Sequence, residues 1–153
     1  MSCAIKGSEM LLSRADAVAE SITKLKGFIG HSQLMAIGRI CHSEERKFMY
    51  SKLAELARIV ETMPKTYEAD GQTDPVVFLH YFMGGMDWHI TERDMMPKQL
   101  QAFGLANLGY GGELGYISIT EITRAGAEID LHWQPKPLSR CTGQNLRSNP
   151  TDR

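Results

Sequence analysis

VFLHYFMGGMDWHI, residues 77–90, predicts a β-hairpin. Two segments rich in aromatic and β-branched side chains flank a Gly-Gly pair at 84–85, and a two-residue glycine turn is a common hairpin connection. The turn fixes the register of the two strands, so that His80 lies directly opposite His89. Whether this histidine pair is a functional site is the first question that the sequence raises.

The side chains of the hairpin alternate between two faces, because successive residues of a strand point to opposite sides. The more apolar face should meet the core, and it carries Val77, Leu79, Tyr81, Met83, Met86, Trp88, Ile90 and Glu92. The other face carries Phe78, His80, Phe82, Asp87, His89 and Thr91. The first five of these residues, Phe78, His80, Phe82, Asp87 and His89, form the candidate interaction face.

The opposed histidines permit two chemical interpretations. Their Cβ atoms should lie about 4.5–5.5 Å apart, close enough to grip one metal ion with Asp87 as a third ligand. A zinc site also needs a fourth position and oriented imidazoles, and no nearby signature supplies them, so we predict no catalytic metal and no cofactor. The second interpretation is a pH effect. Two charged imidazoles on one face repel, so acidification should weaken any partner that docks there.

Glu92 is the charged member of the apolar face. An ionised carboxylate in a core is costly unless it is paired. We therefore expect Glu92 at the strand end, near solvent or an arginine, with a buried general acid as the alternative.

The chain before the hairpin is predicted to be helical. Apolar residues at spacings of three and four indicate helices over about 8–26, 32–40 and 43–63. Ser32 and Ser43 are the expected N-caps, and Pro64 should end the third helix. We expect Trp88 and Trp133 to lie in one core beneath this helical layer.

The chain from residue 74 onward has strand signals, at about 76–82, 86–93, 100–106, 114–117 and 128–134. Ser118 and Glu121 form a capping box for one short helix that ends near Gly126. The predicted fold is α+β, with N-terminal helices packed on a small, mainly antiparallel sheet and one short helix before the last strand. The predicted organisation is a helical layer (1–63), a β-rich domain (74–138) and a disordered tail (139–153).

Length and composition suit an ordinary globular protein. The 153 residues carry a net charge of −1, and no run of 18 apolar residues could span a bilayer. The N-terminus lacks a secretory signal, so we expect a cytoplasmic protein with no membrane contact. Three widely spaced cysteines favour reduced thiols over a disulfide framework.

Three motifs carry a resemblance to a known family. They are FGLANLG (103–109), ELGYIS (113–118) and DLHWQPKPL (130–138). With the surrounding residues 74–138, they resemble a domain-of-unknown-function family found in accessory proteins of bacteriophages, conjugative plasmids and other mobile elements, and the preceding helices resemble the extension of phage-borne relatives. The resemblance implies a small α+β domain in a bacterial cytoplasm. It implies no catalytic residues.

Three functions compete at this stage. The first is a non-enzymatic mobile-element accessory protein that binds a host or phage protein, for example to inhibit a host defence such as restriction or CRISPR interference. The second is a metal-dependent hydrolase or nuclease built on His80, Asp87 and His89, assisted by Glu92 or Glu113. The third is a single-stranded nucleic-acid binder that stacks bases on Phe78 and Phe82. Because residues 63–97 carry six acidic and two basic side chains, nucleic acid is not favoured, and we rank the interaction protein first. The oligomeric state is not predicted.

Overall fold

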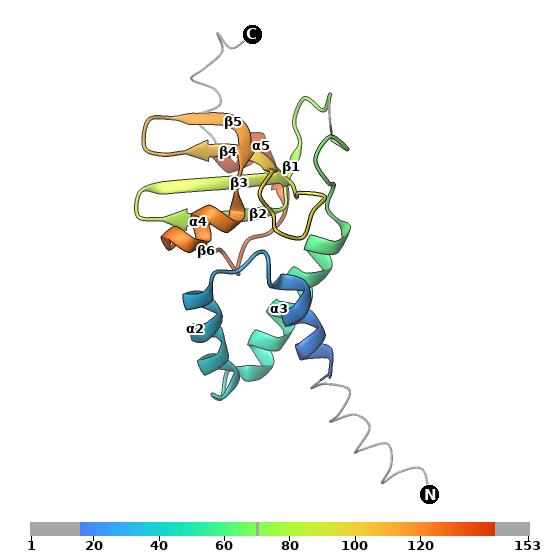
Figure 1. Ribbon diagram of the computed structural model, residues 1–153, viewed down its shortest axis with the longest axis vertical. Coiled ribbons are helices and arrows are strands. Elements are labelled where there is room, and N and C mark those ends of the chain that lie inside the picture. The colour runs from blue at the N-terminus through green and yellow to red at the C-terminus, as the bar shows by residue number, and fades with distance from the viewer. Residues whose placement is uncertain (1–15, 70, 143–153) are drawn as a thin grey trace, which may run out of the picture.

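The computed structural model describes residues 16–69 and 71–142, and its central element is a five-stranded antiparallel sheet (Figure 1). The strands lie in the order β5-β4-β3-β2-β6. Their bounds are β2 Leu79–Met83, β3 Met86–Glu92, β4 Ala102–Asn107, β5 Gly112–Ile117 and β6 Glu128–Ile129. The predicted α+β class is confirmed.

The hairpin has the predicted register. Met83 pairs with Met86 across the turn, and His80 pairs with His89. Glycine permits the positive φ of 58° that the turn requires at Gly84. The antiparallel pairing of β3 with β4 is regular from Asp87 to Ile90, and the register shifts between Ile90 and Glu92.

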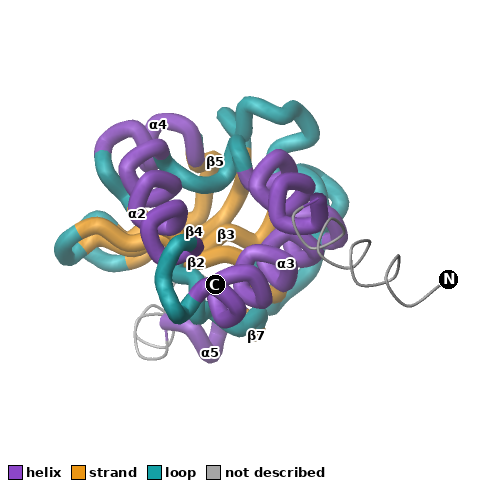
Figure 2. Tube along the Cα trace, turned by 90° about the horizontal axis from the view of Figure 1, so that it is seen from below, coloured by secondary structure: helices purple, strands orange, loops and turns teal. Residues whose placement is uncertain are grey.

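One face of the sheet is covered by helices (Figure 2). Residues 16–25 are helical, followed by α2 (His31–Cys41), α3 (Arg46–Thr62) and, after β5, α4 (Ile119–Ala125). The sheet contributes apolar side chains to this main core, including Leu79, Tyr81, Trp88, Ile90 and Ile129. The apolar stripe predicted for the third helix is buried there in full, as Met49, Leu53, Leu56, Val60 and Met63.

The predicted N-caps agree with the structure in one case of three, whereas α3 ends before Pro64 and α4 ends at Gly126 as predicted. Ser118 caps α4 by accepting from the Glu121 amide. Ser32 instead lies inside α2, which has Gly30 as its N-cap. Ser43 accepts from the Glu45 amide in a turn before α3, whose N-cap is Glu45. Both serines therefore stand two residues from the observed caps, because local hydrogen bonding alone does not decide where a helix begins.

The opposite face of the sheet is covered by the end of the described chain. β1 (Val76–Val77) pairs with β7 (Lys136–Pro137), and α5 (Leu138–Thr142) follows. A second, smaller core forms there from Val77, Leu105 and Leu138, with Trp133 and Cys141 packed against it. The expectation that Trp133 shares a core with Trp88 is therefore wrong, because the sheet separates the two indoles.

Three further predictions need correction at this covered face. The strand expected over 128–134 is limited to β6, because the chain turns away to reach β7. Val77 joins the second core while Phe78 packs against the main one, because β1 leaves the hairpin to pair with β7 and the alternation restarts at β2. α5 continues past Leu138, where we expected order to end. The remaining tail, 143–153, lies outside the described residues.

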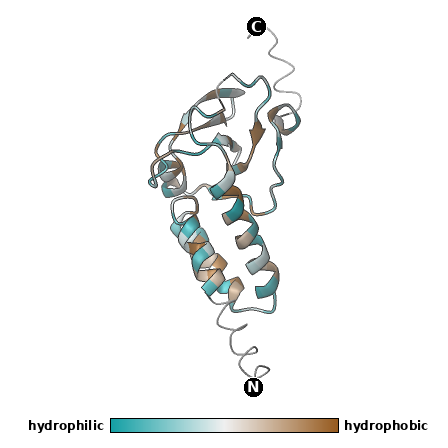
Figure 3. Cartoon of the chain, turned by 90° about the vertical axis from the view of Figure 1, so that its right-hand side faces the viewer, coloured by the Kyte–Doolittle hydropathy of each residue, from teal (hydrophilic) through white to brown (hydrophobic). Residues whose placement is uncertain are grey.

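Seen from the side, the helical part and the β-rich part follow one another along the long axis of the molecule (Figure 3). The two parts share the main core, in which Leu25 and Leu53 meet Tyr81 and Ile129. None of the helices within residues 16–69 and 71–142 has both the length and the apolar character needed to cross a bilayer.

Candidate functional site

The two histidines of the hairpin lie at the centre of a polar and aromatic cluster. Their rings stack with centroids 4.8 Å apart, and the Trp133 ring lies 4.9 Å from that of His80. The His80 ring stands between two carboxylates: Nε2 lies 2.6 Å from Asp87, and Nδ1 lies 3.1 Å from Asp130. A protonated imidazole donates to both carboxylates, whereas a neutral ring donates to one of them.

His89 has the opposite environment. Its side chain is buried, and its Nδ1 has no hydrogen-bond partner among the described residues. Burial is the main cause of a lowered pKa, which falls from 6.5 to about 4; His80 and Lys136 act in the same direction, and Asp87 opposes them. Near neutral pH, His89 is therefore an uncharged ring packed beside His80.

This cluster attaches the segment 130–138 to the sheet. The Asp130 amide donates to the His80 carbonyl, and the Trp133 indole donates to the Val77 carbonyl. Among the described residues, no three His, Cys, Asp or Glu side chains form a group that could hold a metal ion. These contacts hold the segment 130–138 against the sheet.

The five residues of the candidate interaction face do not share one surface. The fold brings together His80, His89 and Asp87. Phe82 is exposed at the rim, and its ring lies 6.0 Å from that of His80. Phe78 packs against the main core on the other side of the sheet.

The depressed pKa of His89 predicts an acid-sensitive fold. Between pH 6.5 and about pH 4, His89 is protonated in the unfolded chain but not in the folded chain. The free energy of unfolding therefore decreases as the pH is lowered through this range. Between pH 7 and pH 5 this histidine alone should cost about 2 kcal/mol of unfolding free energy. Urea unfolding at both pH values, followed by tryptophan fluorescence, measures the loss. His89→Phe keeps a ring but cannot titrate, so it should lose about 2 kcal/mol less than wild type; an equal loss in both proteins would contradict the assignment.

A second feature lies at the end of the sheet where β3 stops and β4 begins. We call it the loop platform: residues 64–69 and 93–101. The two loops are joined by backbone hydrogen bonds of 2.9 Å, from Arg93 to Pro64 and from Thr66 to Arg93. The first loop precedes the hairpin in the sequence and the second follows it, and the fold places the two side by side.

Glu92 holds the first loop in place. Its carboxylate is buried and accepts from the amides of Tyr67, at 3.2 Å, and Ala69, at 2.8 Å. The expectation of a solvent-facing Glu92 or an arginine partner is wrong, because backbone amides supply the hydrogen bonds that a buried carboxylate needs. In consequence Tyr67 is held with a positive φ of 78°.

Asp94 and Gln99 hold the second loop. The buried Asp94 carboxylate accepts from the amides of Met96, Leu100 and Gln101 at 3.0–3.1 Å. The Gln99 side chain accepts from the Asp94 amide and donates to the Met96 carbonyl. Gln99 is almost fully buried and has a positive φ of 53°.

The second loop, residues 93–101, also packs tightly against the helical part of the chain. A Cβ at Gly27 would lie 2.6 Å from the Pro97 carbonyl oxygen, so glycine is required for this approach. The Ile119 amide, at the start of α4, donates to the Gln99 carbonyl. The second loop is therefore held by hydrogen bonds within it, by the close contact with Gly27 and by the hydrogen bond from α4.

The outer side of the loop platform carries large apolar side chains beside the exposed Lys65, Glu68 and Lys98. Four large side chains are about half exposed or more, namely Tyr67, Met95, Met96 and Leu100. Tyr67 also contacts the sheet: its hydroxyl accepts a hydrogen bond of 2.8 Å from the hydroxyl of Tyr116 on β5. Such a concentration of exposed apolar groups on a rigid support is typical of an interaction site.

Sequence reasoning missed the loop platform. Glu92 and Asp94 were visible as acids next to a strand end, in TERD at 91–94. Their role depends on backbone amides that come from residues 67–69 and 96–101, and no periodic pattern marks those partners. The exposed Met95-Met96 pair in a polar connection was the available signal.

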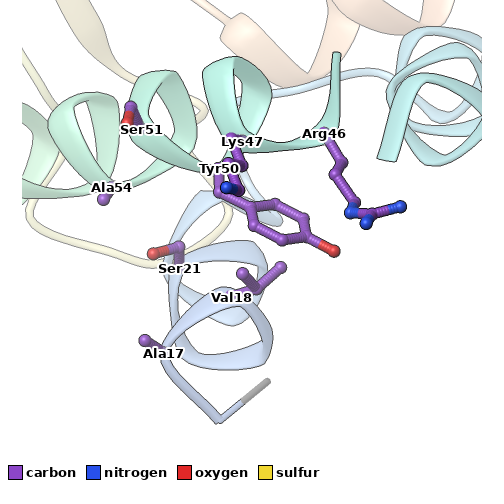
Figure 4. Close-up of a pocket in the computed structure, with 8 residues that line it drawn as sticks. All are labelled: Ala17, Val18, Ser21, Arg46, Lys47, Tyr50, Ser51 and Ala54. Atoms are coloured by element: carbon purple, nitrogen blue, oxygen red, sulfur yellow. The ribbon is translucent and has the colours of Figure 1, made fainter. Parts of the chain in front are cut away.

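A groove of about 480 Å³ lies between residues 17–21 and α3 (Figure 4). Val18 and the ring of Tyr50 line it, and the Arg46 side chain stands to one side of that ring. It is separate from the histidine cluster and from the loop platform. Its residues form no pairing of nucleophile and base, so we assign no chemistry to it.

Comparison with known proteins identifies the family. A family model described as "Protein of unknown function (DUF2958)" matches residues 45–136. No curated protein and no solved structure matches the chain. The match covers more than half of the chain, from α3 to β7, and the chain therefore belongs to this family.

Proposed function

We propose that this DUF2958 family member is a non-enzymatic protein that acts by binding another protein through the loop platform. The resemblance of its motifs to proteins of phages and plasmids supports a mobile-element origin, action in a bacterial cytoplasm and a host or phage protein as the partner. Inhibition of a host defence system is the role we propose for that binding.

One observation carries the proposal. Within the described residues, two non-glycine residues have positive φ, Tyr67 and Gln99, and each belongs to one loop of the platform. Such backbone conformations cost about 1–3 kcal/mol each and persist where the surroundings impose them. Here two buried acids, Glu92 and Asp94, impose them. The fold thus maintains strain that presents apolar side chains to solvent.

The chemistry of the exposed side chains indicates the kind of partner surface. Methionine is unbranched and polarisable, so Met95 and Met96 can fill an irregular apolar pocket. Because the backbone beneath them is already fixed, little backbone conformational entropy is lost on binding. A partner with an apolar depression would bury these side chains together with Leu100 and Tyr67.

The first test compares two exposed methionines. Met96, on the loop platform, is 64% exposed, and Met35, on α2, is 55% exposed. Tagged wild type, Met96→Lys and Met35→Lys are used to capture proteins from a bacterial host lysate, and the proteins retained are quantified by mass spectrometry. We expect at least one protein to be captured by wild type and Met35→Lys and reduced more than about tenfold with Met96→Lys.

Direct binding completes this test. The captured protein is purified and its affinity for the three variants is measured by calorimetry, while circular dichroism checks that all three are folded. Equal affinity of Met96→Lys and Met35→Lys would contradict the proposed site. Capture of no protein that depends on Met96 would contradict the proposed function.

A further inference from the structure

The groove between residues 17–21 and α3 has the size and lining of a small-molecule site. Its volume is about 480 Å³, and ligand sites in proteins commonly measure about 300–1,000 Å³. Its lining is mainly apolar, and small side chains leave it open between the two helices (Figure 4), namely Ala17, Ser21, Ser51 and Ala54. No nucleophile and base are paired there, so binding is the activity that its composition suits.

Two cations give the groove a positive charge. Arg46 and Lys47 line it, and no acidic residue does. Within residues 16–69 and 71–142, neither cation forms an ion pair. The exposed acids that precede α3, Glu44 and Glu45, do not line the groove. α3 begins at Arg46 with no acid in its first turn, so the positive end of the helix dipole also favours an anion here.

Tyr50 joins the charged part of the groove to the apolar part. It follows Arg46 by four residues on α3, so the two side chains are neighbours on one face of the helix. Figure 4 shows the Tyr50 hydroxyl pointing to the side on which Arg46 stands. Within the described part of the chain, this hydroxyl has no hydrogen-bond partner. A phenol and a guanidinium can donate to the same carboxylate.

We propose that the groove binds an aliphatic carboxylate, the anion of a medium-chain fatty acid. The carboxylate accepts hydrogen bonds from Arg46 and Tyr50, and the hydrocarbon chain lies along Val18 and Ala54. α3 advances about 12 Å from Arg46 to Ala54, at about 1.5 Å per residue, which accommodates an extended chain of about ten carbons. The groove is separate from the loop platform, and this binding does not depend on the function proposed for the platform.

Titration with decanoate tests the ligand class. Calorimetry with the full-length chain, below the concentration at which decanoate forms micelles, should show one molecule bound with a Kd of about 1 mM or lower. Acetate has the same head without the chain, and decyltrimethylammonium has the same chain with a positive head. Both should bind more than about tenfold more weakly. Amide NMR should show decanoate-dependent shifts at residues 17–21 and 46–54, and none at the histidine cluster.

Three variants test the assigned residues, with circular dichroism to check that each is folded. Arg46→Gln should raise the Kd for decanoate more than about tenfold. Lys52→Gln is the matched control and should leave it unchanged, because the Lys52 ammonium lies over the Phe48 ring, outside the groove. Ala54→Phe keeps the cations but fills the groove, so it should abolish binding.

Four outcomes would overturn the proposal. The first is no saturable binding of decanoate to the full-length chain, which is also the result expected if residues 1–15 of the chain itself fill the groove. The second is equal affinity for decyltrimethylammonium. The third is an equal effect of Arg46→Gln and Lys52→Gln, and the fourth is unchanged binding by Ala54→Phe.

Discussion

Gly104→Ala is expected to lower the free energy of unfolding by about 3 kcal/mol or more, the upper part of the range for overpacking. A Cβ at this position would collide with the carbonyl oxygen of His89 and lie 2.9 Å from the Ile90 Cα. These are backbone atoms of the neighbouring strand, in the middle of the sheet, so no flexible side chain can move aside. Urea unfolding followed by circular dichroism measures the loss.

Gly115→Ala is the matched control for this substitution. It makes the same chemical change in the next part of the sheet, on β5, where a Cβ would meet no atom within 4 Å. We expect a change below about 1 kcal/mol there, since strand propensity is the main effect. Equal effects at the two glycines would show that β3 and β4 do not approach each other as described. The collision at Gly104 also gives a physical reason for the first glycine of the FGLANLG motif.

Trp88→Ala should cost about 3–5 kcal/mol, as large-to-small changes in a core do. The indole is 6% exposed and lies in the main core, opposite Tyr81 on the neighbouring strand. Its removal leaves a cavity between the sheet and the helices, and the surrounding structure of a packed core relaxes only in part to fill such a space. Chemical denaturation monitored by circular dichroism measures the change, so that loss of the fluorophore does not matter.

Trp133→Ala serves as the comparison. Trp133 is half-buried, packs against the small second core and donates to the Val77 carbonyl. We expect about 2 kcal/mol for the lost packing and hydrogen bond. A cost below about 1 kcal/mol for Trp88→Ala would reverse the assignment of the hairpin faces.

Local patterns predicted the parts of the candidate site that depend on neighbouring strands. The glycine turn placed His80 opposite His89, because a two-residue connection leaves one register. Asp87 followed as a neighbour of His80. Asp130 and Trp133 did not follow, since they belong to a segment forty residues or more along the chain that folds over the sheet.

The sequence by itself determined most of the elements and the buried faces of α3 and of the paired strands β2 and β3, because helical and strand periodicities record which side of each element is apolar. It therefore specified the stripe of α3, the capped start of α4 and the pairing of β2 with β3. Tertiary structure decided what covers each polar group. Glu92 is an ordinary strand-end acid in the sequence, and only the return of residues 67–69 provides the amides that let it be buried. Such long-range hydrogen bonds have no period in the sequence, and the loop platform that depends on them exists only in the folded chain.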